Sequence, residues 1–323
     1  MFVALIAIAS LITVVVVLLY LFFTLDCDVT LFVAEKFGKK PNALKNKVVW
    51  ITGASSGIGE GLAYILAAAG SKLVLSGTNE SNLNQVRRKC LESNPILEDS
   101  DVLIVPFNIT HCDKHKDKVK EVLQHFKKID ILVNNAGKSQ RASFEEIDLE
   151  VDKELFDINV FGLINLTRLV AKYWYESNLK GHLVVTSSLT GKVGVPYSAT
   201  YTASKHALHG YFEAIRLESF CKGICVTLVC PGPVFSAVLQ NALKGKKGEV
   251  VGGSGHSADS KRMTAQRCGY LMSIAIANKL DEVWVTEHPY LLMLYAMQYF
   301  PSITRFILCR FLTKERISKM RDG

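Results

Sequence analysis

Tyr201 and Lys205 are the side chains of this sequence whose types and spacing most directly suggest chemistry. Four residues apart on a helix, a phenol and an ammonium lie on one face, where the cation can lower the pKa of the phenol from about 10. Ser188 stands thirteen residues before the tyrosine, in a serine pair that ends a β-like run. A Tyr-x-x-x-Lys pair alone is common on exposed helix faces. Together with the glycine-rich turn described next, these residues indicate an enzyme that transfers a hydride.

The glycine-rich turn, Thr52-Gly53-Ala54-Ser55-Ser56-Gly57-Ile58-Gly59, follows the apolar run 48–51 and leads into a helical pattern. Glycines there let the backbone approach a pyrophosphate, and the free N–H groups of a helix N-terminus favour an anion. Such a turn is a weak signal when it stands alone. The order strand, turn, helix supplies the context that a dinucleotide fingerprint requires. The segment therefore predicts a dinucleotide-binding site.

The residues after the second apolar run bear on which dinucleotide is bound. In NAD-binding proteins an acidic side chain near this place accepts a hydrogen bond from the ribose 2′-hydroxyl. Here the chain reads Ser76-Gly77-Thr78-Asn79, without an acid and without an Arg or Lys, and Ser56 occupies the turn position where a basic residue could help. We expect NADP(H) to be favoured over NAD(H), because the missing carboxylate leaves room for a 2′-phosphate.

Seven short apolar runs alternate with helical patterns between residues 45 and 286. Most of the runs are apolar on both faces, which is typical of a buried parallel sheet with helices on both sides. We therefore predict an α/β fold, a Rossmann-type doubly wound sheet of seven parallel strands. The expected strands are 48–51, 72–75, 102–105, 130–133, 183–186, 226–229 and 283–285.

The two ends of the chain suggest a membrane. Residues 1–25 carry no charged side chain, and at about 1.5 Å per residue they can cross a hydrocarbon core of roughly 30 Å. A transmembrane anchor is predicted rather than a cleaved signal peptide, because a basic n-region and a clear cleavage site are missing. Residues 26–44 are expected to be a basic linker that is either solvated or close to anionic lipid. The lysines there favour a cytoplasmic domain but leave the orientation open.

Residues 287–323 predict an amphipathic, helical tail, because apolar and aromatic positions alternate with basic ones there. Such a tail could lie on a bilayer, close a lipophilic pocket, or make a dimer or core contact. Residues 237–267 are polar and rich in glycine. They are expected to form a substrate lid, or alternatively a disordered surface loop.

Charge and cysteine content exclude other classes of protein. The net charge of +8 does not indicate a nucleic-acid partner, because Lys and Arg are scattered and form no basic stripe with interleaved aromatic residues. The eight cysteines show neither a C-x-x-C pair nor histidines at ligand spacing. A disulfide framework and a metal site are therefore not predicted, and core thiols are the simpler interpretation.

Over roughly residues 45–285 the chain resembles the short-chain dehydrogenase/reductase family. The resemblance depends on six motifs that occur in the family's order, which makes a chance match implausible. They are the turn 52–59, Asn134-Asn135-Ala136-Gly137, Asn159, Ser188, Tyr201-x-x-x-Lys205 and Pro231-Gly232.

The resemblance implies four catalytic residues. Tyr201 would be the general acid that protonates a carbonyl oxygen, or the base in the reverse direction, with its pKa lowered by Lys205. Lys205 would also bond the nicotinamide ribose. Ser188 would hold the substrate oxygen, so that Ser188 and Tyr201 are the expected substrate contacts. Asn159, in a helix that it can distort, would hold a water of a proton relay.

The resemblance also implies the cofactor contacts. Asn135 is expected to brace the central strands more than to touch substrate. Two positions depart from the family's pattern, because Asn108-Ile109 replaces an acidic-hydrophobic pair beside adenine, and Thr78 stands where an arginine would support NADP. The predicted contacts are Thr52, Gly53, Ser55, Ser56, Gly57, Ile58, Gly59, Thr78, Asn79, Asn108, Ile109, Asn135, Ala136, Gly137, Tyr201, Lys205, Pro231, Gly232, Val234 and Ser236.

Residues 45–286 are thus expected to form one dehydrogenase/reductase domain. The leading prediction is an NADP(H)-dependent oxidoreductase with a single N-terminal membrane anchor, interconverting a lipophilic carbonyl compound and its alcohol. The resemblance implies the endoplasmic reticulum membrane as its location and a steroid or retinoid as a substrate. A catalytically silent NADPH-binding scaffold and a reductase of long-chain 3-keto lipids remain alternatives. The resemblance further implies a homodimer, although the sequence does not choose between a dimer and a tetramer.

Overall fold

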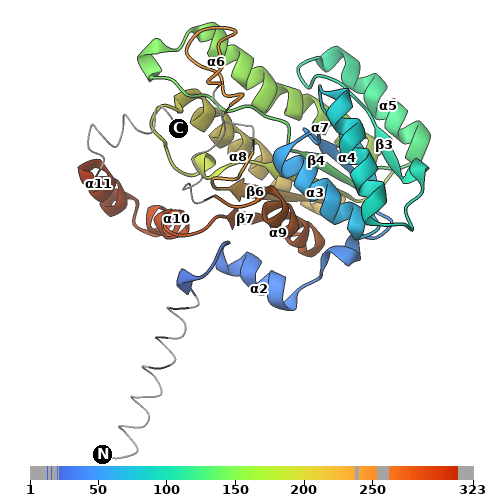
Figure 1. Ribbon diagram of the computed structural model, residues 1–323, viewed down its shortest axis with the longest axis horizontal. Helices are drawn as coiled ribbons and strands as arrows, with labels where there is room; N and C mark the ends of the chain where they lie inside the picture. The colour runs from blue at the N-terminus through green and yellow to red at the C-terminus, as the bar shows by residue number, and fades with distance from the viewer. Residues whose placement is uncertain are drawn as a thin grey trace, which may run out of the picture.

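A computed structural model describes residues 22–236, 240–252 and 262–311, together with residues 13, 16 and 20. Seven parallel strands in the order β3-β2-β1-β4-β5-β6-β7 form the centre, and helices cover both faces of the sheet (Figure 1). The predicted doubly wound fold and all seven predicted strands are confirmed. The strands are β1 Val48–Thr52, β2 Lys72–Ser76, β3 Val102–Ile104, β4 Ile131–Asn134, β5 Gly181–Thr186, β6 Ile224–Pro231 and β7 Glu282–Val285.

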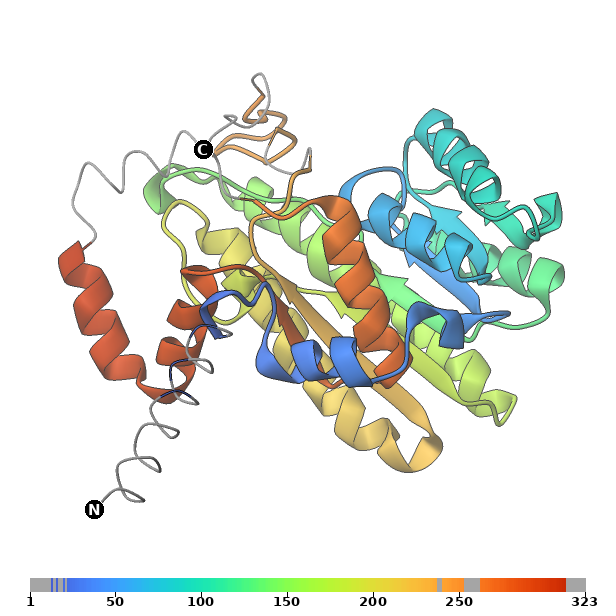
Figure 2. The same ribbon diagram turned by 60° about the horizontal axis from the view of Figure 1, so that its bottom comes forward.

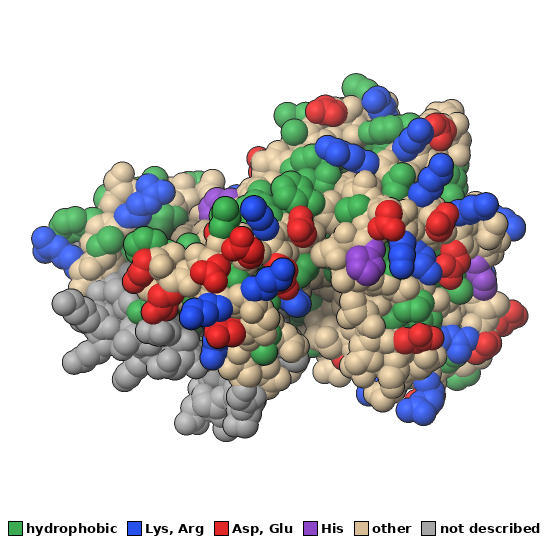
Figure 3. Space-filling view, turned by 90° about the horizontal axis from the view of Figure 1, so that it is seen from above, with side chains coloured by type: hydrophobic (Ala, Val, Ile, Leu, Met, Phe, Trp, Pro, Cys, Tyr) green, Lys and Arg blue, Asp and Glu red, His purple; other side chains and the backbone are tan. Residues whose placement is uncertain are grey.

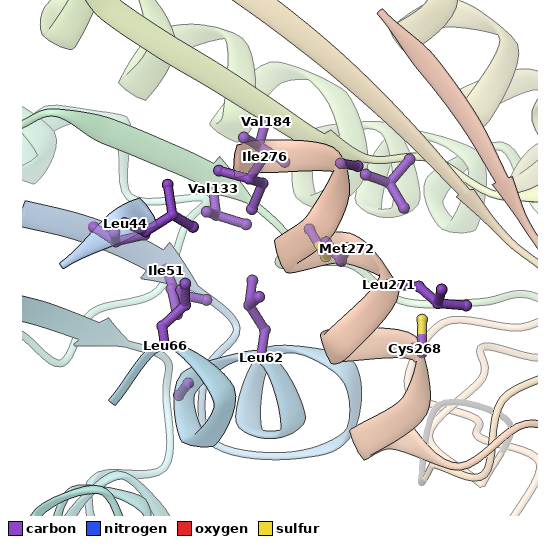
Figure 4. Packing of buried hydrophobic residues seen from close by; sticks show 14 of the residues in the cluster. Leu44, Ile51, Leu62, Leu66, Val133, Val184, Cys268, Leu271, Met272 and Ile276 are labelled. Atoms are coloured by element: carbon purple, nitrogen blue, oxygen red, sulfur yellow. The ribbon is translucent and has the colours of Figure 1, made fainter. Parts of the chain in front are cut away.

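The alternation of side chains along each buried strand builds two cores. Val49 and Ile51 of β1 enter one core, and Val48 and Trp50 enter the core on the opposite face. Helices α3 (Gly57–Ala68), α4 (Glu80–Ser93) and α9 (Ala265–Asn278) close the first core, and α5 (His115–Phe126), α7 (Gly162–Glu176) and α8 (Ala199–Ser219) close the second. In Figure 4, Leu62, Ile51 and Met272 meet in the space between α3, α9 and the sheet. The sheet is therefore rigid on both faces, and its carboxyl edge provides a fixed frame for a site.

Short turns of helix connect these elements. Helix α6 (Leu149–Phe156) continues without a break through a π-helical turn, Asp157–Phe161, into α7. The remaining short turns are 3₁₀ helices at Pro41–Leu44, Asp99–Asp101, Cys112–Lys114, Phe144–Glu146, Leu189–Gly191 and Phe220–Lys222.

The predicted transmembrane anchor, residues 1–25, lies almost entirely outside the described residues. Within the part of the chain that the structure describes, no helix combines the length and the apolar character needed to cross a membrane. Helix α2 (Val29–Phe37) follows the predicted anchor segment.

Residues 26–44, predicted to be a basic linker that is either solvated or close to anionic lipid, pack against the folded body. Asp28 caps α2 by accepting from the N–H of Leu31 at 3.0 Å, and its carboxylate also accepts from the N–H of Trp284 in β7 at 2.7 Å. Arg267 of α9 donates to the carboxylates of Asp26 and Glu35. These three carboxylates thus attach residues 26–44 to the body, and the chain leaves the end of the anchor segment in a fixed position.

The tail forms two helices, α10 (Tyr290–Tyr299) and α11 (Pro301–Phe311), and residues 312–323 lie outside the described part. Leu294 of α10 is buried against Leu189 and Val193, in the loop that follows the predicted catalytic serine. Helix α11 projects from the body, beside α10 (Figure 2). Its apolar side chains, such as Phe306 and Phe311, are largely exposed. The tail therefore supports the catalytic loop with one helix and presents an apolar surface with the other.

The surface shown in Figure 3 carries basic and acidic side chains interspersed with one another. Apolar side chains lie between them rather than in a separate area of this face. The net charge of +8 is therefore not gathered into a stripe on the face in view.

Candidate active site

A cleft of about 720 Å³ opens where the chain leaves the carboxyl ends of five strands. Thr52, Ser76, Asn135, Thr186 and Pro231 mark these ends on β1, β2, β4, β5 and β6. In open parallel sheets this edge, near the point where the strand order reverses, is where ligands bind. All predicted cofactor contacts line the cleft except Gly59.

The glycine-rich turn supplies one wall of the cleft through its backbone. Gly53 and Gly57 have φ values of 65° and 61°, a left-handed conformation that favours glycine. Gly59 does not face the cleft but lies behind the turn, where an added Cβ would come within 2.3 Å of the carbonyl oxygen of Gly53. The N-terminus of α3 therefore approaches the turn as closely as backbone allows, and its free N–H groups lie where a phosphate would be bound.

Asn135 braces the turn, as the sequence predicts. Its side-chain nitrogen donates to the carbonyls of Thr52 and Gly53, both at 3.1 Å, and its side-chain oxygen accepts from the hydroxyl of Thr186 at 3.1 Å. The Thr52 hydroxyl accepts from the N–H of Asn135 at 3.0 Å. One amide thus links the ends of β1, β4 and β5, and a shift of any of these strands would disturb the turn.

Uncharged side chains line the end of the cleft near β2. Thr78 and Asn79 follow the strand, and Asn79 caps α4 by accepting from the N–H of Asn82 at 2.9 Å. Of the described residues that line the cleft, only Lys138, Glu154 and Lys205 are charged, and none of them belongs to this end. Among the described residues, then, no carboxylate stands ready for a ribose 2′-hydroxyl and no cation for a 2′-phosphate.

These walls fit a nicotinamide dinucleotide. The cradle made by Gly53 and Gly57 leaves room for a pyrophosphate against backbone N–H groups. Phe107 and Ile109 provide apolar surface at the end near β2, and the buried reactive side chains lie at the opposite end. The cleft thus extends from a candidate phosphate site to a group of titratable residues.

Tyr201 and Ser188 meet at that opposite end. A hydrogen bond from the Ser188 hydroxyl lowers the pKa of Tyr201, while burial raises it more strongly, so that the pKa lies above its ordinary value. The charge of Arg141 also acts to lower it. The sequence predicts this effect from Lys205, whose ammonium lies 5.7 Å from the centre of the tyrosine ring. The tyrosine is therefore a protonated acid held by a hydroxyl and faced by an unpredicted cation.

Lys205 is buried one helical turn after the tyrosine. Its ammonium donates to the carbonyl oxygen of Thr186 at 2.9 Å. Burial lowers the pKa of Lys205 to about 8, although interaction with Cys230 acts in the opposite direction. A lysine with this pKa can release and regain a proton near neutral pH, which suits a relay better than a permanent charge.

Asn159 is fully buried and does not line the cleft. Its side-chain oxygen accepts from the N–H of Lys138 at 2.8 Å, and its nitrogen donates to the carbonyl of Lys138 at 2.9 Å and to the Ser204 hydroxyl at 3.1 Å. The predicted helix distortion is present as the π turn Asp157–Phe161. Asn159 thus fixes the segment after β4 against helix α8. That Asn159 holds a water of a proton relay stays a prediction.

Part of the predicted lid, residues 240–252, is held by main-chain hydrogen bonds. The Leu243 N–H donates to Ser139 at 3.0 Å, and its carbonyl accepts from the N–H of Arg141 at 2.8 Å. Asn241 and Val250 line the cleft. The rest of the predicted lid consists of residues outside the described part, 237–239 and 253–261, and of residues 262–267, which lead into α9.

The cleft also contains residues that the sequence did not single out as contacts. Most of them adjoin a predicted motif and could have been found by extending it, whereas the two from the lid carry no such signal. They are Ser76, Gly77, Asn82, Phe107, Thr110, Lys138, Glu154, Ile158, Thr186, Ser187, Asn241 and Val250.

Comparison with known protein sequences identifies relatives of this chain. The sequence model of the short chain dehydrogenase family matches residues 47–247. Dehydrogenase/reductase SDR family member 7 of Homo sapiens is 42% identical over 304 residues, which cover 94% of this chain and 88% of the relative. Three segments of the sequence predict a resemblance to this relative, namely Tyr201 to Gly210, Cys230 to Val234 and Glu282 to Val285. The identity over 94% of the chain confirms that prediction.

Solved structures share the fold. A short chain dehydrogenase/reductase from Burkholderia phymatum in complex with NAD aligns with a TM-score of 0.69 at 23% identity, over 81% of this chain and 96% of the other. An alcohol dehydrogenase from the archaeon Thermococcus sibiricus, complexed with 5-hydroxy-NADP, aligns with a TM-score of 0.64 at 21% identity, over 75% and 97%. At these identities the similarity establishes the architecture alone.

Proposed function

The chain belongs to the short-chain dehydrogenase/reductase family, whose members are oxidoreductases acting on CH–OH and C=O groups, and we propose its function from this premise. We propose a membrane-anchored, NADP(H)-dependent enzyme that interconverts a lipophilic carbonyl compound and its alcohol. The observation that carries the proposal is the buried Tyr201 hydroxyl, bonded to Ser188 in the same cleft as the glycine-rich turn. Steroids, retinoids and similar ketones or aldehydes are the proposed substrates.

The side chains at the reaction end have different roles in a carbonyl reduction. A bound nicotinamide dinucleotide would supply or accept the hydride. The Ser188 hydroxyl orients the carbonyl oxygen, and Tyr201 donates its proton to that oxygen as negative charge develops there. In the direction of alcohol oxidation the same phenol, deprotonated, accepts the proton. The protonated tyrosine favoured by burial suits the reductive direction near neutral pH.

Lys205 and Asn159 support the proton transfer without touching the substrate oxygen. With a pKa of about 8, Lys205 can hand a proton toward Tyr201 and regain one from solvent at a pH near neutrality. Asn159 holds the backbone of Lys138 by two hydrogen bonds, which keeps the segment beside the Lys205 ammonium in place. The relay therefore depends on a rigid backbone as much as on the titrating groups.

NADP(H) is the proposed cofactor because, among the described residues that line the cleft, the end near β2 offers no carboxylate to repel a 2′-phosphate. Its hydroxyl and amide groups, such as those of Thr78 and Asn79, can bind either a phosphate or a ribose. The variant Thr78→Asp should shift preference toward NADH, and Thr78→Arg should strengthen NADPH binding, as measured by fluorescence titration. Equal affinity of the native protein for both cofactors would refute the preference.

The endoplasmic reticulum membrane is the proposed location, with one N-terminal anchor. Residues 1–25 are uncharged, and Asp26 and Asp28 attach the chain that follows them to the body. The ring of Phe22 contacts His288 and Tyr295, so the end of the anchor segment lies beside α10. Substrates that partition into lipid would reach an enzyme held at the bilayer. Protease protection in sealed microsomes tests the location and gives the orientation.

A homodimer is the proposed assembly. Apolar side chains near the ends of α7 and α8 are available to a second copy of the chain, since Phe161, Leu217 and Phe220 leave 55%, 80% and 80% of their surface exposed. Light scattering of the detergent-solubilised protein measures the mass. A monomer at micromolar concentration would contradict the assignment.

The decisive assay follows NADPH oxidation and NADP reduction with a panel of steroids, retinoids and long-chain ketones. The native protein is compared with Tyr201→Phe, which removes one oxygen and keeps the ring. Turnover that requires the tyrosine supports the proposal, and a preference for long-chain 3-keto compounds would change the substrate class. If cofactor binds well but no compound gives Tyr201-dependent turnover, the protein is a nucleotide-binding scaffold.

A further inference from the structure

Arg141 lies in the segment that follows β4, close to the beginning of α8. Its Nη1 atom donates a hydrogen bond to the hydroxyl of Ser198. Ser198 is the residue before the first turn of α8, and Tyr201 lies three positions later in that turn. A guanidinium at this place faces a helix N-terminus, where a cation is unfavourable unless a negative charge is nearby.

The backbone around Arg141 is joined to the described lid segment, residues 240–252. The Arg141 N–H donates to the Leu243 carbonyl at 2.8 Å, and the Leu243 N–H donates to the Ser139 carbonyl at 3.0 Å. The Leu243 side chain packs in a small apolar cluster against which the Tyr201 ring lies. Arg141, the lid segment and the tyrosine therefore form one packed unit.

The charge of Arg141 is not neutralised by an acid. Among the described residues no carboxylate forms an ion pair with it, and its Nε atom is buried without a hydrogen-bond partner. Arg262, which follows the lid, is a second positive charge that faces it. The group nearby that can become an anion is the phenol of Tyr201, and the two groups interact electrostatically.

The other charged groups around Tyr201 come from three directions. Lys205 lies on the same helix and is bound to a carbonyl of β5. Lys138, in the same segment as Arg141, pairs with Glu154 of α6 at 3.6 Å. Asp152 of α6 accepts from the Thr200 hydroxyl. Arg141 thus keeps its positive charge near the phenol. No carboxylate of the described residues pairs with it, and a guanidinium does not lose its proton near neutral pH.

We propose that Arg141 is a positioning residue whose permanent charge stabilises the deprotonated form of Tyr201 and whose place is fixed by the lid segment. The inference rests on the proposed function, in which Tyr201 is the acid and base. An opposite charge close to a buried group favours the charged form of that group. Loss of the charge would leave the tyrosine a weaker acid, and opening of the lid segment would have the same consequence.

The test measures the ionisation of Tyr201 directly, in the protein without cofactor. Ultraviolet difference titration of each protein against its Tyr201→Phe version isolates this one phenol from the other tyrosines. Arg141→Gln keeps a hydrogen-bond donor but removes the charge, and it should raise the pKa of Tyr201 by about one unit. Arg141→Lys should restore most of the native pKa. Arg168→Gln, which removes a cation stacked on Tyr211 of α8, is the matched control and should change nothing.

Kinetics give an independent measurement. In alcohol oxidation the tyrosine must be deprotonated, so the rising limb of the rate against pH should move upward in Arg141→Gln by the same amount. In carbonyl reduction it must be protonated, so the falling limb should move upward as well. A purely structural role would lower the rates without moving either limb.

An unchanged pKa of Tyr201 in Arg141→Gln, with native circular dichroism, would overturn the inference. If that variant does not fold, Ser198→Ala loosens the guanidinium instead, and it should raise the pKa by a smaller amount; no change there overturns the inference equally. Failure of the proposed function is a separate result. If the native protein turns over substrate without needing Tyr201, the titration still measures whether Arg141 lowers the pKa of Tyr201.

Discussion

The two ends of the cleft are built from different parts of the chain. At the phosphate end, Gly53 and Gly57 present backbone in left-handed conformations, and the N-terminus of α3 supplies N–H groups. At the reaction end, the partly buried side chains of Ser188 and Tyr201 share a hydrogen bond beside the buried ammonium of Lys205. In the proposed function, backbone groups bind the cofactor at the first end, and titratable side chains carry out the chemistry at the second.

This difference predicts how each end responds to substitution. The phosphate end should tolerate changes of polar side chains but not an added Cβ atom, because the backbone must lie close to the ligand. The reaction end should tolerate changes of shape better than the loss of a single oxygen or nitrogen, because burial makes the partner of a lost polar atom costly to leave unpaired. Affinity for cofactor and rate of hydride transfer should therefore be separable by mutation.

A large difference between the ends is expected from Ser188→Ala. Removal of a donor to the substrate oxygen should lower kcat by about 10²- to 10³-fold, since the charge that develops there loses a partner. NADPH affinity, measured by fluorescence titration, should stay within about twofold, since one hydroxyl at the reaction end does not touch the phosphate cradle. Ser187→Ala removes the neighbouring hydroxyl, which has no hydrogen-bond partner among the described residues, and should cost far less. Equal losses in the two serine variants would contradict this assignment.

Gly59→Ala should show the opposite pattern. The new Cβ would meet the carbonyl oxygen of Gly53 at 2.3 Å, so the turn must move. Overpacking of this kind costs about 1 to 3 kcal/mol, and part of that cost should appear as weaker NADPH binding. Saturating cofactor should restore most of kcat. A native dissociation constant in this variant would show that the turn does not hold the cofactor.

Lys205→Met should change the dependence of stability on pH. The folded protein lowers the pKa of Lys205 from its ordinary 10.5 to about 8. The unfolded chain therefore holds a proton between these values that the folded protein lacks, so stability rises with pH across this window. The native protein should gain on the order of 2 to 3 kcal/mol there relative to Lys205→Met. Parallel stability curves from urea denaturation would contradict the burial of a titrating lysine.

Gly210→Ala should have the smallest effect. Gly210 lies on α8 beyond the catalytic residues, and an added Cβ meets nothing within 4 Å. Alanine should stabilise the helix by about 0.5 to 1 kcal/mol. Thermal unfolding measures the gain, and neither cofactor affinity nor kcat should change. Destabilisation would show that α8 has a neighbour at this position.

Local patterns made the fold and most of the site predictable. Each buried strand is a short apolar run, and each catalytic residue stands in a motif whose spacing places it at a strand end or on one helix face. Tyr201 and Lys205 illustrate this, because the helix period alone brings them to one side. Such features need only a few neighbouring residues to be recognised.

Contacts between distant segments were not predictable. Residues 26–44 resemble a linker because the partners of Asp28 and Glu35, Trp284 and Arg267, lie more than 230 residues away. Arg141 gains its place from Leu243 and Ser198 through bonds that are partly main chain to main chain, which leave no mark in side-chain composition. The lid segment was not predictable for the same reason, because its polar sequence gives no sign that its backbone is hydrogen-bonded to the body.

The most direct test of the separation between the two ends is a stopped-flow measurement of single-turnover hydride transfer in Tyr201→Phe, with NADPH binding measured on the same preparation. NADPH should bind with its native dissociation constant, and the rate of NADPH oxidation by a reactive lipophilic ketone should fall by about 10²- to 10⁴-fold. A native rate with intact binding would contradict the account, because the phenol would then play no part in the chemistry of the cleft.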